Sequence, residues 1–288
     1  MPHTLLQDAP ARERMPDGFD PQCVDFEELC AFLHEFVTTM LSMGSQTARM
    51  VRSAKRIADV FGADIEMLVL FKHAVVTISS RLDKKLCKTV VIPFRQIGLN
   101  FDLSYRLNRL SWELSDSLPA QNAPGATGNE ALHTVRRQFY ELLQRPRLSH
   151  IALCVMIGVA SAAFCRLFRG DLYSMAVVFV ASQAAFATRY WMLKNALDTR
   201  MAFFTAAFVS SFLTALAIVR LPSATPSVAV AASVLFLVPG VPLLNAVNDF
   251  IDGYTLMGIS RGVHASILIL CVGFGLATSI LLTGFNVL

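Results

Sequence analysis

The chain has 288 residues, of which 54% are hydrophobic and 16% are charged, and its formal net charge is +4. Soluble proteins carry roughly 25% charged residues, so this composition indicates a membrane protein. The positive charge is small, and no basic run with interleaved aromatic residues occurs, which excludes nucleic acid from the expected partners.

Charged residues are concentrated at 1–147, whereas 148–288 consist mainly of Ala, Val, Leu, Phe and Ser. This contrast predicts a soluble domain followed by a membrane domain. Residues 1–20 include three prolines and have little apolar content, which is typical of a disordered tail. Because they also lack the apolar core of a signal peptide, we expect the soluble domain, 21–147, to stay in the cytoplasm.

The six cysteines are scattered, without a Cys-x-x-Cys pair or a histidine at metal-ligand spacing. Three of them lie within apolar segments. We therefore expect reduced, structural thiols rather than disulfides or metal ligands, and no cofactor is indicated.

Apolar residues recur at helical spacing in the first part of the soluble domain. They predict one helix over 26–43 and a second from Ser45 or Thr47 to Phe61, with Gly44 ending the first. Three runs rich in Val, Ile and Leu then have the length of strands: Ile65–Phe71, Ala74–Ser79 and Leu86–Ile92. We expect them to form a small antiparallel sheet.

Two more helices are predicted at 103–117 and 130–143, with a flexible linker rich in Pro and Gly, 119–128, between them. The order of two helices, three strands and two helices favours an α+β domain of two layers.

No catalytic motif accompanies these elements. His34, His73 and His133 are isolated in the sequence, and the chain contains no nucleophile elbow, P-loop or His-Glu-x-x-His. We therefore expect a protein that is not an enzyme. The second helix has a basic face, which is either solvated or a contact for anionic lipid or a partner subunit; it comprises Arg49, Arg52, Lys55 and Arg56.

Five apolar segments follow, each near the ~20 residues that cross the hydrocarbon core of a bilayer. Small residues recur in them, and such residues favour close helix packing in lipid. We expect a bundle of five transmembrane helices, at Leu148–Phe168, Leu172–Met192, Met201–Val219, Pro226–Val247 and Gly262–Leu282.

Basic residues are unevenly distributed between the two ends of this predicted bundle. Eight belong to the end that adjoins the soluble domain (Arg136, Arg137, Arg145, Arg147, Arg189, Lys194, Arg200 and Arg261) and three to the other (Arg166, Arg169 and Arg220). The positive-inside rule therefore predicts a cytoplasmic soluble domain, and five crossings then place the C-terminus outside.

The fourth apolar segment is interrupted by Pro239, Gly240 and Pro242. It then ends in three polar residues, Asn245, Asn248 and Asp249. Proline removes a backbone donor and clashes with the preceding turn, so a continuous helix is not expected here. Broken helices that carry polar groups near the midplane are typical of transporter binding sites. These residues are our candidate substrate or coupling-ion site; the alternative is a kinked packing helix whose polar end lies in the headgroups.

A short helix that starts at Pro242 would point its positive N-terminal end into the membrane, where it could hold a carboxylate. Asn245 and Asp249 would share one face of that helix, and Asp249 could bind a proton or a cation. Arg189, near the inner end of the second segment, either extends its charge to the headgroups or attracts anions. We include Arg189 in the candidate substrate site.

The residues around the break strongly resemble the threonine/serine exporter (ThrE) family, and in particular its half-size, YjjP-like type of inner-membrane subunit. The resemblance begins near residue 22, although the soluble domain matches more loosely. Its most specific part is Pro239-Gly-Val-Pro-Leu-Leu-Asn-Ala246; the other parts are Met43–Ala48, Cys165-Arg-Leu167, Arg189 and Gly258-Ile-Ser-Arg261.

This resemblance implies export of small carboxylated metabolites: threonine and serine for the full-length members, succinate-like dicarboxylates for the half-size type. It also implies a second, smaller multi-span membrane subunit as a partner, besides membrane lipid, and a homo-oligomer is left open. The leading interpretation is a subunit of a secondary exporter in the cell inner membrane, since no nucleotide-binding motif is present. A membrane-anchored sensor that binds a ligand through its soluble domain is the alternative.

Overall fold

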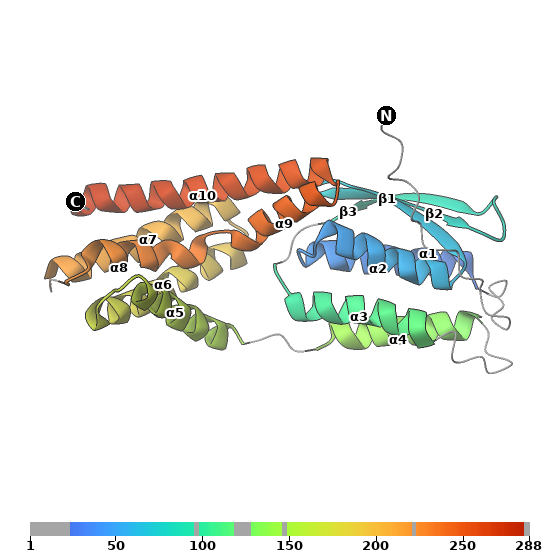
Figure 1. Cartoon of the computed structure of the whole chain (residues 1–288), viewed down its shortest axis with the longest axis horizontal. Helices are drawn as coiled ribbons and strands as arrows, with labels where there is room; N and C mark the ends of the chain where they lie inside the picture. Colours follow the sequence, from blue (N-terminus) through green and yellow to red (C-terminus); the bar gives the residue numbers. More distant parts are fainter. Residues whose placement is uncertain (1–23, 95–97, 118–127, 146–148, 221–222, 285–288) are drawn as a thin grey trace, which may run out of the picture. The chain divides into compact units, whose positions relative to one another are not determined.

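The computed structural model describes residues 24–94, 98–117, 128–145, 149–220 and 223–284. The chain divides into two compact units, 1–145 and 146–288 (Figure 1). The predicted disordered tail, 1–20, and the predicted linker, apart from Gly128, lie outside the described residues.

The first unit combines helices with a three-stranded antiparallel sheet. Each strand pairs with the next in the sequence, so the sheet order is β1-β2-β3. The predicted sheet is confirmed, and so are the helices on either side of it, with bounds that differ by a few residues. The elements are α1 (Phe26–Ser42), α2 (Thr47–Val60), β1 (Ala63–Val69), β2 (His73–Ser80), β3 (Cys87–Pro93), α3 (Phe101–Ser117) and α4 (Gly128–Leu143).

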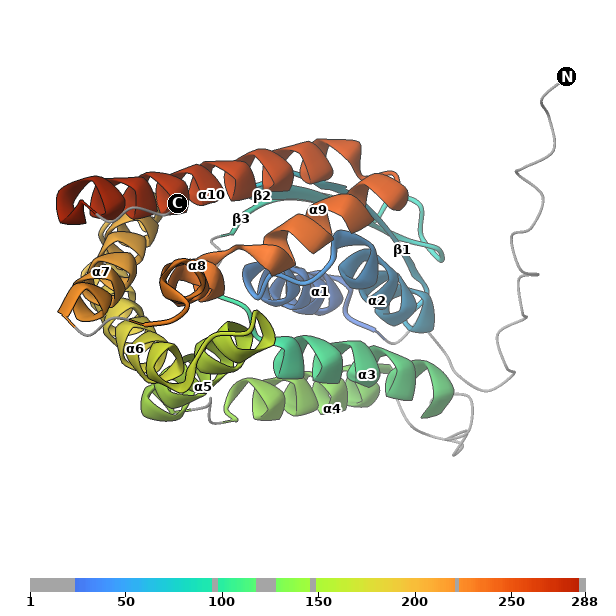
Figure 2. The same ribbon diagram turned by 60° about the vertical axis from the view of Figure 1, so that its left-hand side comes forward.

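Aromatic side chains of α1 lie at the centre of this unit's core. Phe32 and Phe36 are fully buried, and the Phe32 ring meets Phe139 of α4 edge-on, with 5.6 Å between the ring centroids. Helices α1 and α2 pack on the sheet, α3 packs on α2, and α4 packs on α3 (Figure 2). Burial of these apolar faces against one another is the main favourable term in folding this unit.

The second unit consists of helices and their connections, with no strand among its described residues. Helix α8 packs against α5, α6 and α7, whereas α9 packs on α10 and α10 packs along α7. The elements are α5 (His150–Leu167), α6 (Leu172–Lys194), α7 (Thr199–Arg220), α8 (Pro226–Val234), the 3-10 turn η2 (Leu235–Leu237), α9 (Gly240–Ile251) and α10 (Thr255–Thr283).

Three of the described helices, α5, α7 and α10, are long and apolar enough to cross a membrane, and a fourth span is added if the bent pair α8–η2 and α9 counts as one. The second predicted span forms α6, which has 23 residues but is not among them. Gln183 and Arg189 lower its apolar character. Five crossings therefore remain a prediction, while a membrane bundle of several spans is supported.

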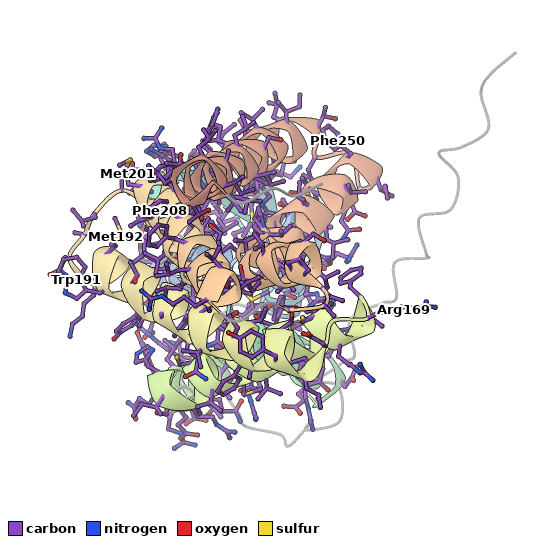
Figure 3. All side chains as sticks on the ribbon, turned by 90° about the vertical axis from the view of Figure 1, so that its left-hand side faces the viewer. Arg169, Trp191, Met192, Met201, Phe208 and Phe250 are labelled. Atoms are coloured by element: carbon purple, nitrogen blue, oxygen red, sulfur yellow. The ribbon has the colours of Figure 1, made fainter. Side chains whose placement is uncertain are left out.

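The connection between α6 and α7 has the residues of a membrane–water boundary. Trp191 and Met201 are exposed and point outward from the ends of the two helices (Figure 3). Lys194 and Arg200 lie in the same connection region. Tryptophan and basic side chains together are typical of the interface between lipid tails and water.

At the other end of α6 from the α6–α7 connection, Asp171 links the α5–α6 connection to the α7–α8 connection. Its carboxylate accepts a hydrogen bond from the Ser174 amide at the start of α6 (2.8 Å) and another from the Ala224 amide (3.1 Å) in the connection between α7 and α8. These hydrogen bonds, those with Ser174 foremost, lower the pKa of Asp171 to about 2. The carboxylate therefore stays charged and holds the two connections together at any physiological pH.

Helices α7 and α10 are in close contact at Gly275. A β-carbon built on Gly275 would lie 2.4 Å from the carbonyl oxygen of Phe204 on α7, a distance that real atoms do not adopt. Small residues permit such contacts in lipid, where no hydrophobic force draws helices together. Gly273, two residues earlier on the same helix, has open space around the corresponding position.

The substitution Gly275→Ala is expected to destabilise the bundle by about 1–3 kcal/mol, because the added methyl group forces α7 and α10 apart. The measurement is the melting temperature of the full chain in detergent. Gly273→Ala is the matched control and is expected to leave the melting temperature close to that of the wild type. Equal effects of the two substitutions would contradict the close approach of the helices.

Candidate functional site

The fourth apolar segment is interrupted at Val238 and Pro239. Helix α8 continues into η2, Val238 has extended backbone angles (φ −61°, ψ 123°), and α9 starts at Gly240. The axes of the two halves are bent by 58°. The sequence predicted that this helix starts at Pro242; in the structure, α9 starts two residues earlier. Pro242 is tolerated because N–H groups in the first helical turn have no acceptor within the helix.

Backbone groups near the break find partners on a neighbouring helix. The hydroxyl of Ser210, on α7, donates a 2.7 Å hydrogen bond to the carbonyl oxygen of Ser233 at the end of α8, and both residues are buried. Non-helical backbone at membrane depth is stable only where protein or a watery cavity satisfies it. Here the Ser210 side chain of α7 satisfies one such backbone group, the Ser233 carbonyl.

The break lies toward the end of the bundle at which α6 ends and α7 begins. Leu237, just before the break, is buried in one cluster with Ala185 of α6 and with Phe203 of α7. Arg189 is one helical turn beyond Ala185, and its guanidinium carbon lies 4.8 Å from the centroid of the Phe203 ring. Arg189 thus contacts Phe203, which belongs to the same buried cluster as Leu237.

Helix α9 directs its polar side chains inward and its apolar ones outward. Asn245 is 8% exposed and Asp249 is fully buried, while Asn248 is half-buried. Leu244, Val247 and Ile251 are exposed, and the exposed Phe250 points away from the bundle (Figure 3). This arrangement is the reverse of that in a soluble surface helix, and it fits a helix whose outer face meets lipid.

Asp249 is paired with a residue that the sequence did not place in the site. The Nη1 atom of Arg261, on α10, donates a 2.7 Å hydrogen bond to Oδ2 of Asp249, and the two side chains are 3% and 0% exposed. The sequence assigned Arg261 to a connection and counted it only toward orientation. In the structure it lies inside α10, faces α9, and forms an ion pair with Asp249. Binding of a proton or a coupling cation by Asp249 stays a prediction.

A tight turn between α9 and α10 brings this pair together. Gly253 adopts a left-handed conformation (φ 83°), the Tyr254 amide bonds to the Asp249 carbonyl (2.7 Å), and the Gly253 amide bonds to the Phe250 carbonyl (3.2 Å). This is a Schellman motif, in which glycine is favoured because it has no β-carbon. Gly258 then lets α10 approach α9, since its β-carbon would lie 3.1 Å from the Ala246 carbonyl oxygen.

The predicted site residues thus fall into two groups rather than one. Pro239, Gly240 and Pro242 lie at the break, whereas Asn245, Asn248 and Asp249 line α9 toward the hairpin turn. Arg189, on α6, contacts Phe203 of α7. Nine residues of helix separate Gly240 from Asp249, which corresponds to about 14 Å along the axis. Within the described residues, no cluster of three or more His, Cys, Asp or Glu side chains is arranged to hold a metal ion.

Comparison with known proteins gives one family and two similar relatives. A family model described as "Putative threonine/serine exporter" matches residues 32–283. A protein of Klebsiella aerogenes named "Probable succinate transporter subunit YjjP" is 37% identical over 136 residues, which are 46% of this chain and 52% of the relative. The protein of that name from Escherichia coli (strain K12) is 36% identical over 150 residues, 51% of this chain and 58% of the relative.

The aligned part of the chain therefore spans about half the length of the curated relatives that it matches. No solved structure matches the chain.

Arg261→Gln is expected to destabilise the folded chain by about 3–5 kcal/mol, because it leaves the Asp249 charge buried without its cation. The melting temperature in detergent measures this loss. Arg200→Gln is the matched control: it removes an arginine from an aspartate pair whose side chains are 59% and 47% exposed. An exposed ion pair contributes little to stability. Similar losses of melting temperature in both variants would therefore contradict the claim that burial makes the Arg261–Asp249 pair costly to break.

Proposed function

Because the chain belongs to the threonine/serine exporter family, we propose that it is a subunit of a secondary exporter that carries small carboxylated metabolites out across the cytoplasmic membrane. The family description speaks of threonine and serine, and the names of the two relatives speak of succinate. These compounds share one chemical group, the carboxylate. The proposal therefore rests on carboxylate recognition, with succinate-like dicarboxylates and threonine or serine as the candidate substrates.

The observation that carries this proposal is the cationic environment of the break. The Arg189 guanidinium lies over the ring of Phe203, and Phe203 belongs to the same buried cluster as Leu237 at the end of η2. Ionisable residues are costly within a membrane segment and generally mark the path of a substrate or an ion. The N-terminal end of α9 adds the positive end of a helix dipole to the same region.

Each predicted residue apart from Asp249 has a role in this proposal. Pro239, Gly240 and Pro242 keep the backbone out of a continuous helix, so that amide groups at the start of α9 can face a carboxylate. Arg189 attracts the anion. Asn245 and Asn248 offer amide groups along α9 for the remaining polar atoms of the substrate.

A second membrane subunit would complete the transporter. Both relatives are named as subunits, and the bundle of this chain shows no internal repeat in its sequence. Many transporters consist of two similar bundles in opposite orientation, with the substrate at their interface.

We assign the chain to the inner membrane as a multi-pass protein, with its N-terminal domain in the cytoplasm and its C-terminus outside, because basic residues surround the α6–α7 connection.

The test of this function is the export of labelled succinate and labelled threonine from cells with and without the chain, each together with its partner subunit. The chain is expected to increase export of at least one of the two acids. Arg189→Gln should lower that export by about tenfold, the effect of losing one charge-assisted hydrogen bond.

Arg220→Gln is the control for Arg189→Gln, because it removes an exposed arginine from the other end of α7. It should leave export unchanged. Export of neither acid by the wild-type chain with its partner, or full export by the Arg189→Gln variant, would contradict the proposal.

A further inference from the structure

We propose that Arg261 is a carboxylate-binding residue, and that a carboxylate of the transported acid replaces Asp249 as the partner of its guanidinium group. This inference deepens the exporter proposal and rests on it for the identity of the ligand, a small carboxylate. Neither the sequence motifs nor the names of the relatives assign a role to Arg261.

The first argument is that the Arg261–Asp249 pair is not required to close the hairpin. The Schellman turn at Gly253 fixes the direction of the chain through backbone hydrogen bonds, and Gly258 lets the two helices pack closely. Buried ion pairs are weak stabilising devices, since well-packed apolar side chains of similar volume often serve as well or better. Ionisable pairs inside membrane bundles therefore point to function rather than to stability.

The second argument is the chemistry of the exchange. A buried guanidinium requires an anionic partner, and arginine matches a carboxylate with two parallel hydrogen bonds. The Asp249 side chain and the transported acid present the same group. A substrate carboxylate can therefore take the place of Asp249 without leaving the arginine charge uncompensated.

The third argument is the position of the pair along α9. Asn245 is one helical turn nearer the break than Asp249, and both are buried on the same face. An acid that enters at the break meets first the Asn245 amide and then Arg261. At the other end of α9, Asp252 is exposed and Asn248 is half-exposed. The helix end next to Asp249 therefore carries polar side chains that protein does not cover, and the displaced carboxylate turns toward them.

The experiment is a ligand titration of the full chain in lipid nanodiscs, with the melting temperature as the readout and with succinate and threonine as separate probes. In Asp249→Asn the internal competitor is gone, and the Arg261 charge is left buried without its carboxylate, so without acid this variant is expected to melt at a lower temperature than the wild type. The concentration of acid that gives half of the stabilisation should therefore fall by about tenfold relative to the wild type.

The second variant is the double substitution Asp249→Leu with Arg261→Met, which replaces the pair by apolar side chains of similar size. It should remain folded, with a melting temperature close to that of the wild type, and lose its response to both acids. The matched control is Asp198→Asn with Arg200→Gln, at an exposed ion pair, which should respond as the wild type does.

Three results would overturn the inference: a wild-type chain that responds to neither acid, an unchanged or higher half-saturating concentration in Asp249→Asn, or a normal response in the double apolar variant. Each would leave the pair as a structural contact. Because this titration does not measure export, its outcome is separate from that of the export assay. A chain that binds acid through Arg261 without exporting it would contradict the proposed function alone.

Discussion

The second unit depends on one constraint, which is that every backbone polar group at membrane depth needs a partner inside the protein. Pro239 interrupts the fourth apolar segment, so the usual helical hydrogen bonds are lost near that point. Near the break, the Val238 amide donates a hydrogen bond to the Leu235 carbonyl, and the Ser210 hydroxyl donates one to the Ser233 carbonyl. Helix α8 packs against α5, α6 and α7, and α9 turns away from it by 58°.

The turn of α9 sets up the electrostatics of the unit. It pairs α9 with the first half of α10, which places Asp249 opposite Arg261 in a region with very little contact with solvent. It also leaves the positive end of α9 toward the part of the bundle that contains Arg189 and Phe203. The cationic side chains of the unit thus include Arg189 on α6 and Arg261 on α10.

Sequence reasoning located the helices and strands of the first unit because their apolar periodicity is strong. It also located the break, since proline chemistry is local and does not depend on packing. It did not find Arg261, because the partnership with Asp249 exists only once Gly253 reverses the chain; the resemblance at Gly258–Arg261 was the one available signal. Nor could it place the break at one end of the bundle, since that position depends on how Leu237 packs against α6 and α7.

The central claim, that small acids bind at the break, can be tested by cysteine protection in a background without the native cysteines. A β-carbon at Gly240 meets no atom within 4 Å, so Gly240→Cys is sterically allowed, and Gly273→Cys on α10 is equally open as a control. The account predicts that succinate or threonine slows the reaction of Gly240→Cys with a small hydrophilic thiol reagent and leaves Gly273→Cys unaffected. Reaction at Gly240→Cys that is indifferent to both acids, in a chain that still exports them, would contradict it.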